Sequence, residues 1–574
     1  MKKYIIILCS ILIGACGDIL EIPDVTGVNT DVWNDEQGAS LYVNRLYEMS
    51  LPGPGFGVNS PLSDETYGTG DIIVNTIYGN LTANDIDLYS VNFYRRIRDT
   101  NIGLKALESS TLPEDAIGRL KGQMTFLRAL DHWNLVRLYG GVPMVLEDQD
   151  PYETEAINLP RNSARECIEI LVADLDEAIE GLPASWPNNE RGRITRGAAA
   201  AMKGRILLFW ASPQFNPTND QSRWERAYQA NFEAKELLMQ DGYGLHPNFA
   251  QVFTTKGNRE VVFARLFDFN SGKTHGWENS VRPREIGNNG GTGSNPTWEM
   301  VKAFPMSNGV AIDSPDSGYD SVYYFKDRDP RFYATIAYNG VNYTATGFDP
   351  DRKQWSYYVG DNPIDNPGAT TTGFYCRKAT NPNIQQQFTG EADTDWVEIR
   401  FAEVLLNLAE AAAETDRLNV AYNELFALRQ RAGISSGDGF FGLQEAMSKI
   451  ELVDAVIHER QIELAFEDKR YWDLRRRNLF EQKLNGTRRH GIITRLKPGI
   501  NPTDFATIRD QIDLENDYDQ YFEMELWVKD QQFAINYPQP LYNFFGIPQN
   551  VRDRSPEVEQ TIGWENGTFD PLAD

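Results

Sequence analysis

Side chains suited to catalysis or to metal binding form no readable pattern in this sequence. No two of its histidines have the HxxxH spacing of a helical zinc site. Its 82 acidic residues make close carboxylate pairs inevitable by chance, so a catalytic pair cannot be recognised from spacing. The acidic run Asp513–Asp519 lacks the order of an EF-hand, and we expect a solvated loop there rather than a calcium site. We therefore expect no catalytic residue, no bound metal and no cofactor. The histidines are His132, His246, His275, His458 and His490.

Aromatic side chains with polar neighbours offer a binding chemistry instead. Sugar rings present flat C–H faces that stack on exposed aromatic rings, while sugar hydroxyls bond to Asp, Asn and Arg. Aromatic residues make up 12% of the chain, enough to fill a core and still supply a surface. Each ring suits a core position at least as well, so the choice of residues predicts a location more than a set of contacts. The candidate ligand-binding residues are Asp64, Tyr67, Tyr89, Trp277, Arg282, Asn288, Trp298, Tyr319 and Trp355, with Asn289 and Tyr323 as further neighbours.

The N-terminal segment has the features of a lipoprotein signal. Lys2 and Lys3 precede a short apolar stretch, Tyr4–Ile13, which is too short to span a bilayer. The sequence Ile13-Gly14-Ala15-Cys16 that follows resembles a bacterial lipobox, with Ile where Leu is usual. We expect residues 1–15 to be removed, Cys16 to carry a diacylglycerol, and residues 16–30 to form a lipidated tether. An ordinary secretory signal followed by a chance cysteine is the alternative.

Charge and cysteine content exclude some partners. The formal net charge is −27, which repels nucleic acid and anionic membrane surfaces alike. Attachment to a membrane would therefore depend on the lipid. Beyond the leader and Cys16 only Cys167 and Cys376 remain, so no disulfide framework is indicated, although one bond between these two stays open.

Helical periodicity occupies residues 31–240 and 395–480, and irregular sequence rich in Gly, Pro, Asn and aromatics occupies 241–394 and 481–574. Ser163 and Glu166 have the spacing of a capping box, and Gly433 suits a helix C-cap. Short strands are expected at Val261–Arg265 and Ala334–Tyr338. The expected helices are Asp31–Leu51, Asn84–Leu107, Pro113–Leu138, Ser163–Leu182, Ala198–Trp210, Trp224–Leu238, Trp396–Glu414 and Ala421–Gly433.

The segment His458–Arg477, HERQIELAFEDKRYWDLRRR, predicts one long helix because it contains neither Gly nor Pro. Apolar residues lie on both of its sides, so we expect it to be enclosed. Its charges are then expected to pair along the helix, Arg460 with Glu463 and Glu467 with Arg470, at i,i+3 spacing.

This segment resembles the C-terminal signature of the SusD/RagB family. Phe126–Leu146 and Arg400–Ala411 resemble two other family segments, and about ten such segments follow in family order over essentially the whole chain. The resemblance implies a mainly α, SusD-like fold, in which tetratricopeptide-like helix pairs pack against a large irregular, loop-rich region with short strands. It also implies a single domain over residues 31–574. The matching signature residues are Glu459, Arg460, Glu463, Leu464, Phe466, Glu467, Arg470, Asp473, Leu474 and Arg476.

The same resemblance implies a function without catalysis. Members of the family are surface lipoproteins of the Bacteroidetes outer membrane that capture an oligosaccharide or polysaccharide and deliver it to a SusC-like TonB-dependent transporter. Peptide capture, as in RagB-like relatives, is the alternative. Binding residues differ between members, so the resemblance indicates only a location, on loops after the early helices and in the middle irregular region.

Overall fold

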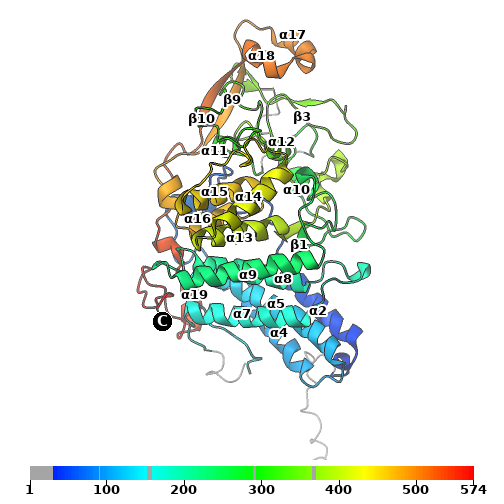
Figure 1. Ribbon diagram of the computed structural model, residues 1–574, viewed down its shortest axis with the longest axis vertical. Coiled ribbons are helices and arrows are strands. Elements are labelled where there is room, and N and C mark those ends of the chain that lie inside the picture. The colour runs from blue at the N-terminus through cyan, green and yellow to red at the C-terminus, as the bar shows by residue number, and fades with distance from the viewer. Residues whose placement is uncertain (1–29, 90, 151–157, 289–292, 365–369, 574) are drawn as a thin grey trace, which may run out of the picture.

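Helices packed in successive layers form one half of the molecule, and loops with short strands form the other (Figure 1). The computed structural model describes residues 30–573 apart from 90, 151–157, 289–292 and 365–369, so the predicted leader and Cys16 lie outside the described residues. No helix in the described part is long and apolar enough to cross a membrane. The helices of the first half are α2 (Glu36–Ser50), α3 (Asp71–Ile77), α4 (Phe93–Leu107), α5 (Glu114–Tyr139), α7 (Ala164–Gly181), α8 (Arg196–Ala211), α9 (Gln221–Gln240), α13 (Phe401–Glu414), α14 (Leu418–Ala432), α15 (Lys449–Glu463) and α16 (Arg470–Arg476).

Each layer of helices packs on the next. Helix α5 contacts α7, α7 contacts α8, α8 contacts α9, and α9 contacts α13. In Figure 1, α4, α5 and α7 lie below α8 and α9, and α13 lies above them. The boundaries follow local signals: Ser163 and Glu166 form both bonds of a capping box, and α14 ends at Gly433 in the left-handed conformation. Small residues permit the close approach of α8 and α9, where Asn231 donates a 3.0 Å hydrogen bond to the carbonyl oxygen of Gly204.

Three expected helices begin later than predicted. The helix expected from Asp31 begins at Glu36, after a separate 3₁₀ turn over Thr30–Asn34. The helix expected from Asn84 begins only at Phe93. The helix expected from Trp396 begins at Phe401, because Trp396–Arg400 is instead a strand, β8, which pairs antiparallel with β1 (Val261–Arg265). Arg265 is opposite Trp396 in this pair. The strand pair therefore joins the start and the end of the loop-rich excursion over residues 266–395.

The loop-rich half contains several small sheets. The largest has the order β10-β9-β5-β6, and its two long strands extend toward the upper end of Figure 1, where α17 and α18 lie between them in sequence. The predicted acidic loop Asp513–Asp519 is a helix there, because Asp513 caps the start of α18 by accepting a bond from the backbone N–H of Glu515. The elements of this half are α10 (Trp277–Val281), α11 (Trp298–Ala303), α12 (Pro330–Thr335), β2 (Ile336–Ala337), β3 (Val341–Asn342), β4 (Lys353–Gln354), β5 (Tyr358–Val359), β6 (Asn362–Pro363), β7 (Tyr375–Cys376), β9 (His490–Leu496), α17 (Pro502–Ile508), α18 (Leu514–Tyr521) and β10 (Phe522–Val528). Helix α19 (Gln549–Arg554) lies beside the helical half instead (Figure 1).

Two hydrophobic cores stabilise the two halves. The larger is built from the helices, and the smaller, under the loops, is rich in aromatic rings such as Phe325 and Tyr338, whose centroids are 4.9 Å apart. Cys167 is buried in the first core and Cys376 in the second, and both are free thiols, so the disulfide left open by the sequence is not formed. Burial raises the pKa of each thiol to about 12.

The prediction of one long helix over His458–Arg477 is wrong. Helix α15 ends at Glu463 and α16 begins at Arg470, with Phe466 and Asp468 between them at positive φ. Tertiary hydrogen bonds replace the helical ones there. The backbone N–H of Phe466 donates to the Glu65 carboxylate at 3.1 Å, and the Asp468 carboxylate accepts from the backbone N–H of Asn59 at 2.9 Å.

The expected pairing of charges along this segment is also wrong, because each charge reaches another element. Arg460 donates to Asp473, across the break, at 2.8 Å. Glu467 accepts from Arg400 on β8 at 2.7 Å. Arg470 forms two 2.9 Å bonds with Asp64. The segment therefore joins both halves of the molecule through buried ion pairs, and the prediction that it is enclosed is confirmed.

Candidate functional site

Four of the nine candidate residues, Asp64, Trp277, Arg282 and Trp355, lie in the interior with their polar atoms in use. Trp355 is 3% exposed and donates its indole N–H to Asp510 at 2.7 Å. Asp64 is buried against Arg470, and although burial alone would raise the pKa of its carboxyl, the guanidinium holds that pKa below the usual value. Neither of these last two side chains presents a free face to solvent.

Trp277 and Arg282, on and just after α10, are buried supports of a surface loop. The Trp277 ring stacks on Phe56, and its N–H donates to the carbonyl oxygen of Lys378 at 3.3 Å. The Arg282 guanidinium pairs with Glu278 at 2.5 Å and donates to the carbonyl oxygens of Asn381 and Ile384. These contacts fix the loop 377–384 in one conformation.

The remaining candidates are scattered. Tyr89 packs against Tyr139 on α5, in the helical half. Tyr319 lies against Arg328, with 5.5 Å between the guanidinium carbon and the ring centroid. Tyr323 donates to Asp519 at 2.8 Å. Asn288 is exposed, and Asn289 lies outside the described residues.

Tyr67, on an early loop, and Trp298, at the start of α11, lie on adjoining segments. The backbone N–H of Thr297 donates to the carbonyl oxygen of Glu65 at 3.0 Å, and Thr66 forms a β-bridge with Pro296. Both rings are half-buried, and Trp298 stacks parallel to Phe374 with 6.1 Å between centroids. The structure thus joins one early loop to the middle irregular region.

Next to Tyr67 lies a group of side chains that the sequence did not single out. We call the set Tyr67, Tyr78, Trp527, Lys529 and Phe533 the aromatic surface. The Lys529 ammonium is 3.3 Å from the centroid of the Trp527 ring and 4.9 Å from that of Tyr67, so one cation joins two rings. Phe533 meets Tyr78 edge-on at 5.8 Å and is 58% exposed. Four aromatic rings and the Lys529 ammonium therefore lie together at the surface.

A buried ion pair fixes this surface from below. Arg489 at the start of β9 donates three bonds to Asp530, of 2.7, 3.0 and 2.9 Å, one of them from its backbone N–H. Tyr78 donates to the same carboxylate at 2.8 Å. Partial burial lowers the pKa of Lys529 to about 8, an effect that the neighbouring Asp530 opposes. The rings are thus set before any ligand arrives.

The sequence carried a weak signal for these residues. Trp527 and Phe533 flank the polar run Lys529–Gln532, so large rings interrupt a stretch that is otherwise suited to solvent. That pattern does not reveal that β10 pairs with β9 and so places Trp527 beside a loop more than 400 residues earlier in the chain.

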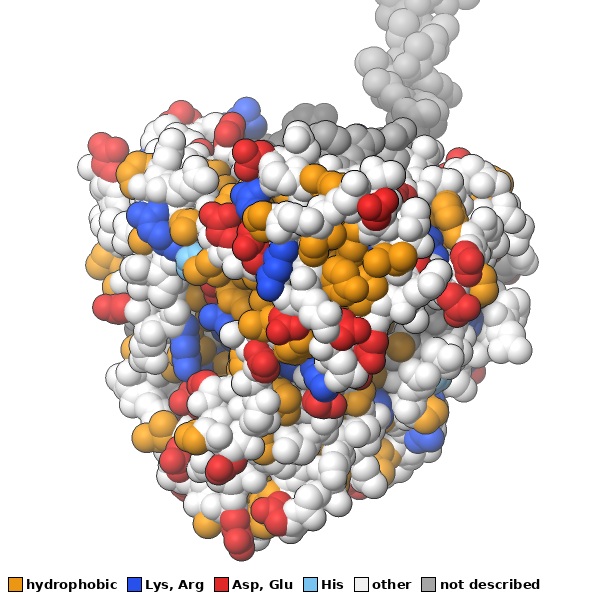
Figure 2. Space-filling model, turned by 90° about the horizontal axis from the view of Figure 1, so that it is seen from above, with side chains coloured by type: hydrophobic (Ala, Val, Ile, Leu, Met, Phe, Trp, Pro, Cys, Tyr) orange, Lys and Arg blue, Asp and Glu red, His pale blue; other side chains and the backbone are white. Residues whose placement is uncertain are grey.

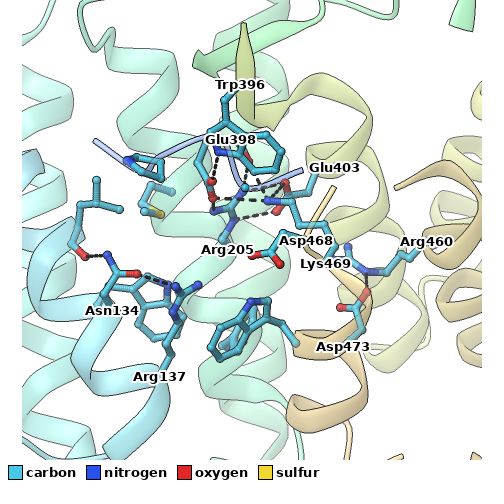
Figure 3. A pocket seen from close by; sticks show the side chains of 17 residues that line it. Asn134, Arg137, Arg205, Trp396, Glu398, Glu403, Arg460, Asp468, Lys469 and Asp473 are labelled. Carbon is cyan, nitrogen blue, oxygen red and sulfur yellow. Dashed lines mark hydrogen bonds and ion pairs between the residues drawn. The ribbon is translucent and has the colours of Figure 1, made fainter. Parts of the chain in front are cut away.

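A second group of charged residues lies in an interior cavity of about 100 Å³ between α5, α8, β8 and α16 (Figure 3). Arg205 pairs there with Glu403 at 2.7 Å and with Glu398 at 2.6 Å. Burial raises the pKa of the nearby Asp468 to about 6. Most of these charges satisfy one another, so the cavity is a polar junction between the two halves.

Apolar side chains also reach solvent at the loop-rich end of the molecule. Figure 2 shows hydrophobic side chains gathered near the middle of this end, with acidic and basic side chains on either side. Contiguous exposed apolar area of this kind is typical of a binding surface.

Two glycine spacings between α14 and α15 match motifs of enzymes but not their structural setting. Gly433–Gly437 has the GxSxG spacing of a nucleophile elbow, which requires a strand before the serine and a helix after it. Gly437–Gly442 has the GxGxxG spacing of a dinucleotide loop, which has the same requirement. Here a helix precedes both motifs, and the next helix begins only at Lys449. Neither spacing therefore forms a catalytic or a nucleotide site.

Comparison with known proteins agrees with this architecture. A family profile described as the SusD family matches residues 259–564, which is more than half of the chain. The chain belongs to the SusD family. A second profile, described as starch-binding associating with outer membrane, matches residues 69–208. The expected mainly α, SusD-like fold is confirmed.

Individual relatives of this SusD-family chain are distant. SusD-like protein P2 of Formosa agariphila is 26% identical over 379 residues, which span 64% of this chain and 66% of P2. A crystal structure of a SusD-like protein from Bacteroides fragilis is 25% identical, with a TM-score of 0.74, over 93% of this chain and 98% of that one. A structure described as a laminarin binding SusD-like protein is 21% identical, with a TM-score of 0.57, over 93% and 99% of the two chains.

Proposed function

We propose that this SusD-family protein binds an oligosaccharide or polysaccharide at the aromatic surface and breaks no bond in it. The observation that carries the proposal is the contact of Lys529 with both Trp527 and Tyr67, which holds two rings in place around one cation. The family match and the laminarin-binding neighbour support a glycan as the ligand.

Rigid rings favour sugar binding because a flat C–H face gains contact area without ordering flexible side chains. Tyr78 and Arg489 are fixed by Asp530, so little conformational entropy remains to be lost on binding. Lys529 and the exposed amides of Gln531 and Gln532 supply donors for sugar hydroxyls at the edge of the rings. Trp298, at the start of α11, follows Thr297, which bonds to the loop of Tyr67.

Titration of a panel of neutral and anionic oligosaccharides by calorimetry tests the site. Trp527→Ala is expected to weaken glycan binding by about 1–2 kcal/mol, which lowers the affinity roughly 5- to 30-fold. Phe232→Ala is the matched control, since Phe232 is a partly exposed ring on α9 in the helical half. Equal affinities of the two variants would remove the aromatic surface from the binding site. Binding of extended peptides without binding of any glycan would favour the RagB-like alternative.

We further propose that the protein is held at the outer membrane surface by a lipid on Cys16 and passes its ligand to a SusC-like TonB-dependent transporter. The lipobox-like sequence supports the anchor, and the outer-membrane description of the second profile supports the location. Cys16→Ala should release the protein from the membrane fraction of the cell. Co-purification of a β-barrel transporter with the anchored protein tests the partner, and its absence under gentle solubilisation would count against delivery.

A further inference from the structure

An open pocket of about 640 Å³ lies in the loop-rich half, between the loop after α9, helix α12 and the loop 377–384. Among the described residues that line it, none is acidic, although the whole chain carries a net charge of −27. Two arginines line the pocket. The guanidinium of Arg282 is used by Glu278 and by two carbonyl oxygens, so Arg377 alone has a guanidinium available.

Arg377 has no carboxylate partner within ion-pair distance in the described part of the chain. Its guanidinium makes one long contact, 3.5 Å, with the carbonyl oxygen of Tyr333, and its carbon lies 5.0 Å from the centroid of the Tyr343 ring. A guanidinium has five N–H donors in a planar fork, which matches the oxygens of a carboxylate or a sulfate. The side chain is only partly buried and lines the open pocket.

The walls of the pocket are already in place. The backbone N–H of Arg377 donates to the carbonyl oxygen of Thr335 at 2.8 Å, and Trp277 and Arg282 hold the loop that follows. Tyr333 is fixed by a 2.7 Å bond from its hydroxyl to the carbonyl oxygen of Phe325, which leaves its ring half-exposed at the rim. Gln251, Thr254 and Asn383 add neutral hydrogen-bonding groups around the guanidinium.

From this geometry we propose that the pocket binds the carboxylate or sulfate group of an anionic saccharide, with Arg377 as the charge partner and Tyr333 beside the sugar ring. This inference rests on the proposed glycan-binding function and adds a preference for negatively charged sugars. The charge distribution supports it. Among the described lining residues none is acidic and only Arg377 has a guanidinium without a carboxylate partner, so the pocket attracts an anion to a protein that otherwise repels anions.

Calorimetry with three probes of equal length tests the pocket: an oligouronate, a sulfated galactan oligosaccharide and a neutral glucan oligosaccharide. At least one anionic probe should bind about tenfold more tightly than the neutral probe, and the difference should shrink as salt is added. Arg377→Gln should lose this preference, and Arg377→Lys should keep part of it, because the charge remains while the fork is lost. Arg95→Gln, which removes an exposed arginine from α4, is the charge-matched control and should behave as wild type.

The outcomes separate the two proposals. Anionic binding that is equal in Arg377→Gln and Arg95→Gln overturns the pocket. Binding of neutral glycans alone also overturns it and leaves the proposed function standing. Binding of no saccharide of either charge overturns both. Circular dichroism of Arg377→Gln that matches wild type shows that a lost preference reflects the pocket and not the fold.

Discussion

Glu463 is the residue whose neutralisation should destabilise the protein most clearly. Its carboxylate accepts bonds from Arg400 at 2.6 Å, from Arg331 at 2.8 Å and from Arg431, and all four side chains are almost fully buried. Burial alone would raise the pKa of Glu463, but the three guanidiniums hold it well below the usual value. Glu463→Gln leaves this cluster with one negative charge too few and adds an amide N–H₂ that cannot accept from an arginine.

The expected loss of stability follows from the buried positive charge that Glu463→Gln leaves without a partner. Removing one partner of a buried ion pair costs about 3–5 kcal/mol, because the remaining charge stays buried and uncompensated. Urea unfolding followed by circular dichroism at pH 7 should therefore show a lower free energy of unfolding by about 4 kcal/mol. Because the folded pKa is depressed, this contribution is present above the ordinary carboxyl pKa of 4.5 and is lost as pH falls toward the folded value.

The matched control is Glu225→Gln. Glu225 bonds to Arg417 at 2.6 and 2.8 Å, but both side chains are largely exposed, and a surface pair contributes less than about 1 kcal/mol. If the two variants lose equal stability, or if Glu463→Gln loses less than about 1 kcal/mol, burial does not make the ion pairs of Glu463 more stabilising than a surface pair.

Three further perturbations have defined outcomes. Burial raises the pKa of Asp131 to about 7, so the protein loses the stability contributed by the protonated carboxyl as pH rises from about 4 to 7. The change in melting temperature caused by Asp131→Asn should therefore be more favourable at pH 8 than at pH 5. An equal change at the two pH values would refute the raised pKa. Gly373 has φ +89°, and an added Cβ would lie 2.2 Å from the carbonyl oxygen of Ile492. In chemical denaturation, Gly373→Ala should therefore lower the free energy of unfolding by more than about 1 kcal/mol. The loss should exceed that of Gly347→Ala, because Gly347 has a similar φ but open space around it. Cys167 and Cys376 should react with a thiol reagent only after the protein is denatured, and rapid labelling of the native protein would contradict their burial.

Local signals in the sequence were sufficient for most of the helical half. The capping box at Ser163 and the glycine after α14 placed helix ends correctly, because both are bonds between residues close in sequence. The break after Glu463 was missed because its cause is distant: Glu65 and Asn59 supply the bonds that replace the helical ones. Trp396–Arg400 was misassigned for the same reason, since its strand partner β1 begins at Val261.

The candidate site residues show the same difference between local signals and distant contacts. Tyr67 and Trp298 were chosen from composition and location, and loop contacts bring them close. Trp277, Arg282 and Trp355 have the residue types of a sugar site but pack inside, because one sequence does not show which face of a short irregular element is covered. Arg377 went unnoticed because its lack of a carboxylate partner can be recognised only once the carboxylates of the described residues have been placed in space.

The strand pair of β1 and β8 has a consequence for how such proteins diversify. The long excursion over residues 266–395 leaves and returns at Arg265 and Trp396, which face each other across two strands. Doubling the length of a closed segment costs only about 0.6 kcal/mol, so insertions and deletions between these two positions hardly strain the helices on which they stand. Surface loops between these two residues can therefore change in length while the helices, and buried partners such as Arg331 within the excursion, stay unchanged.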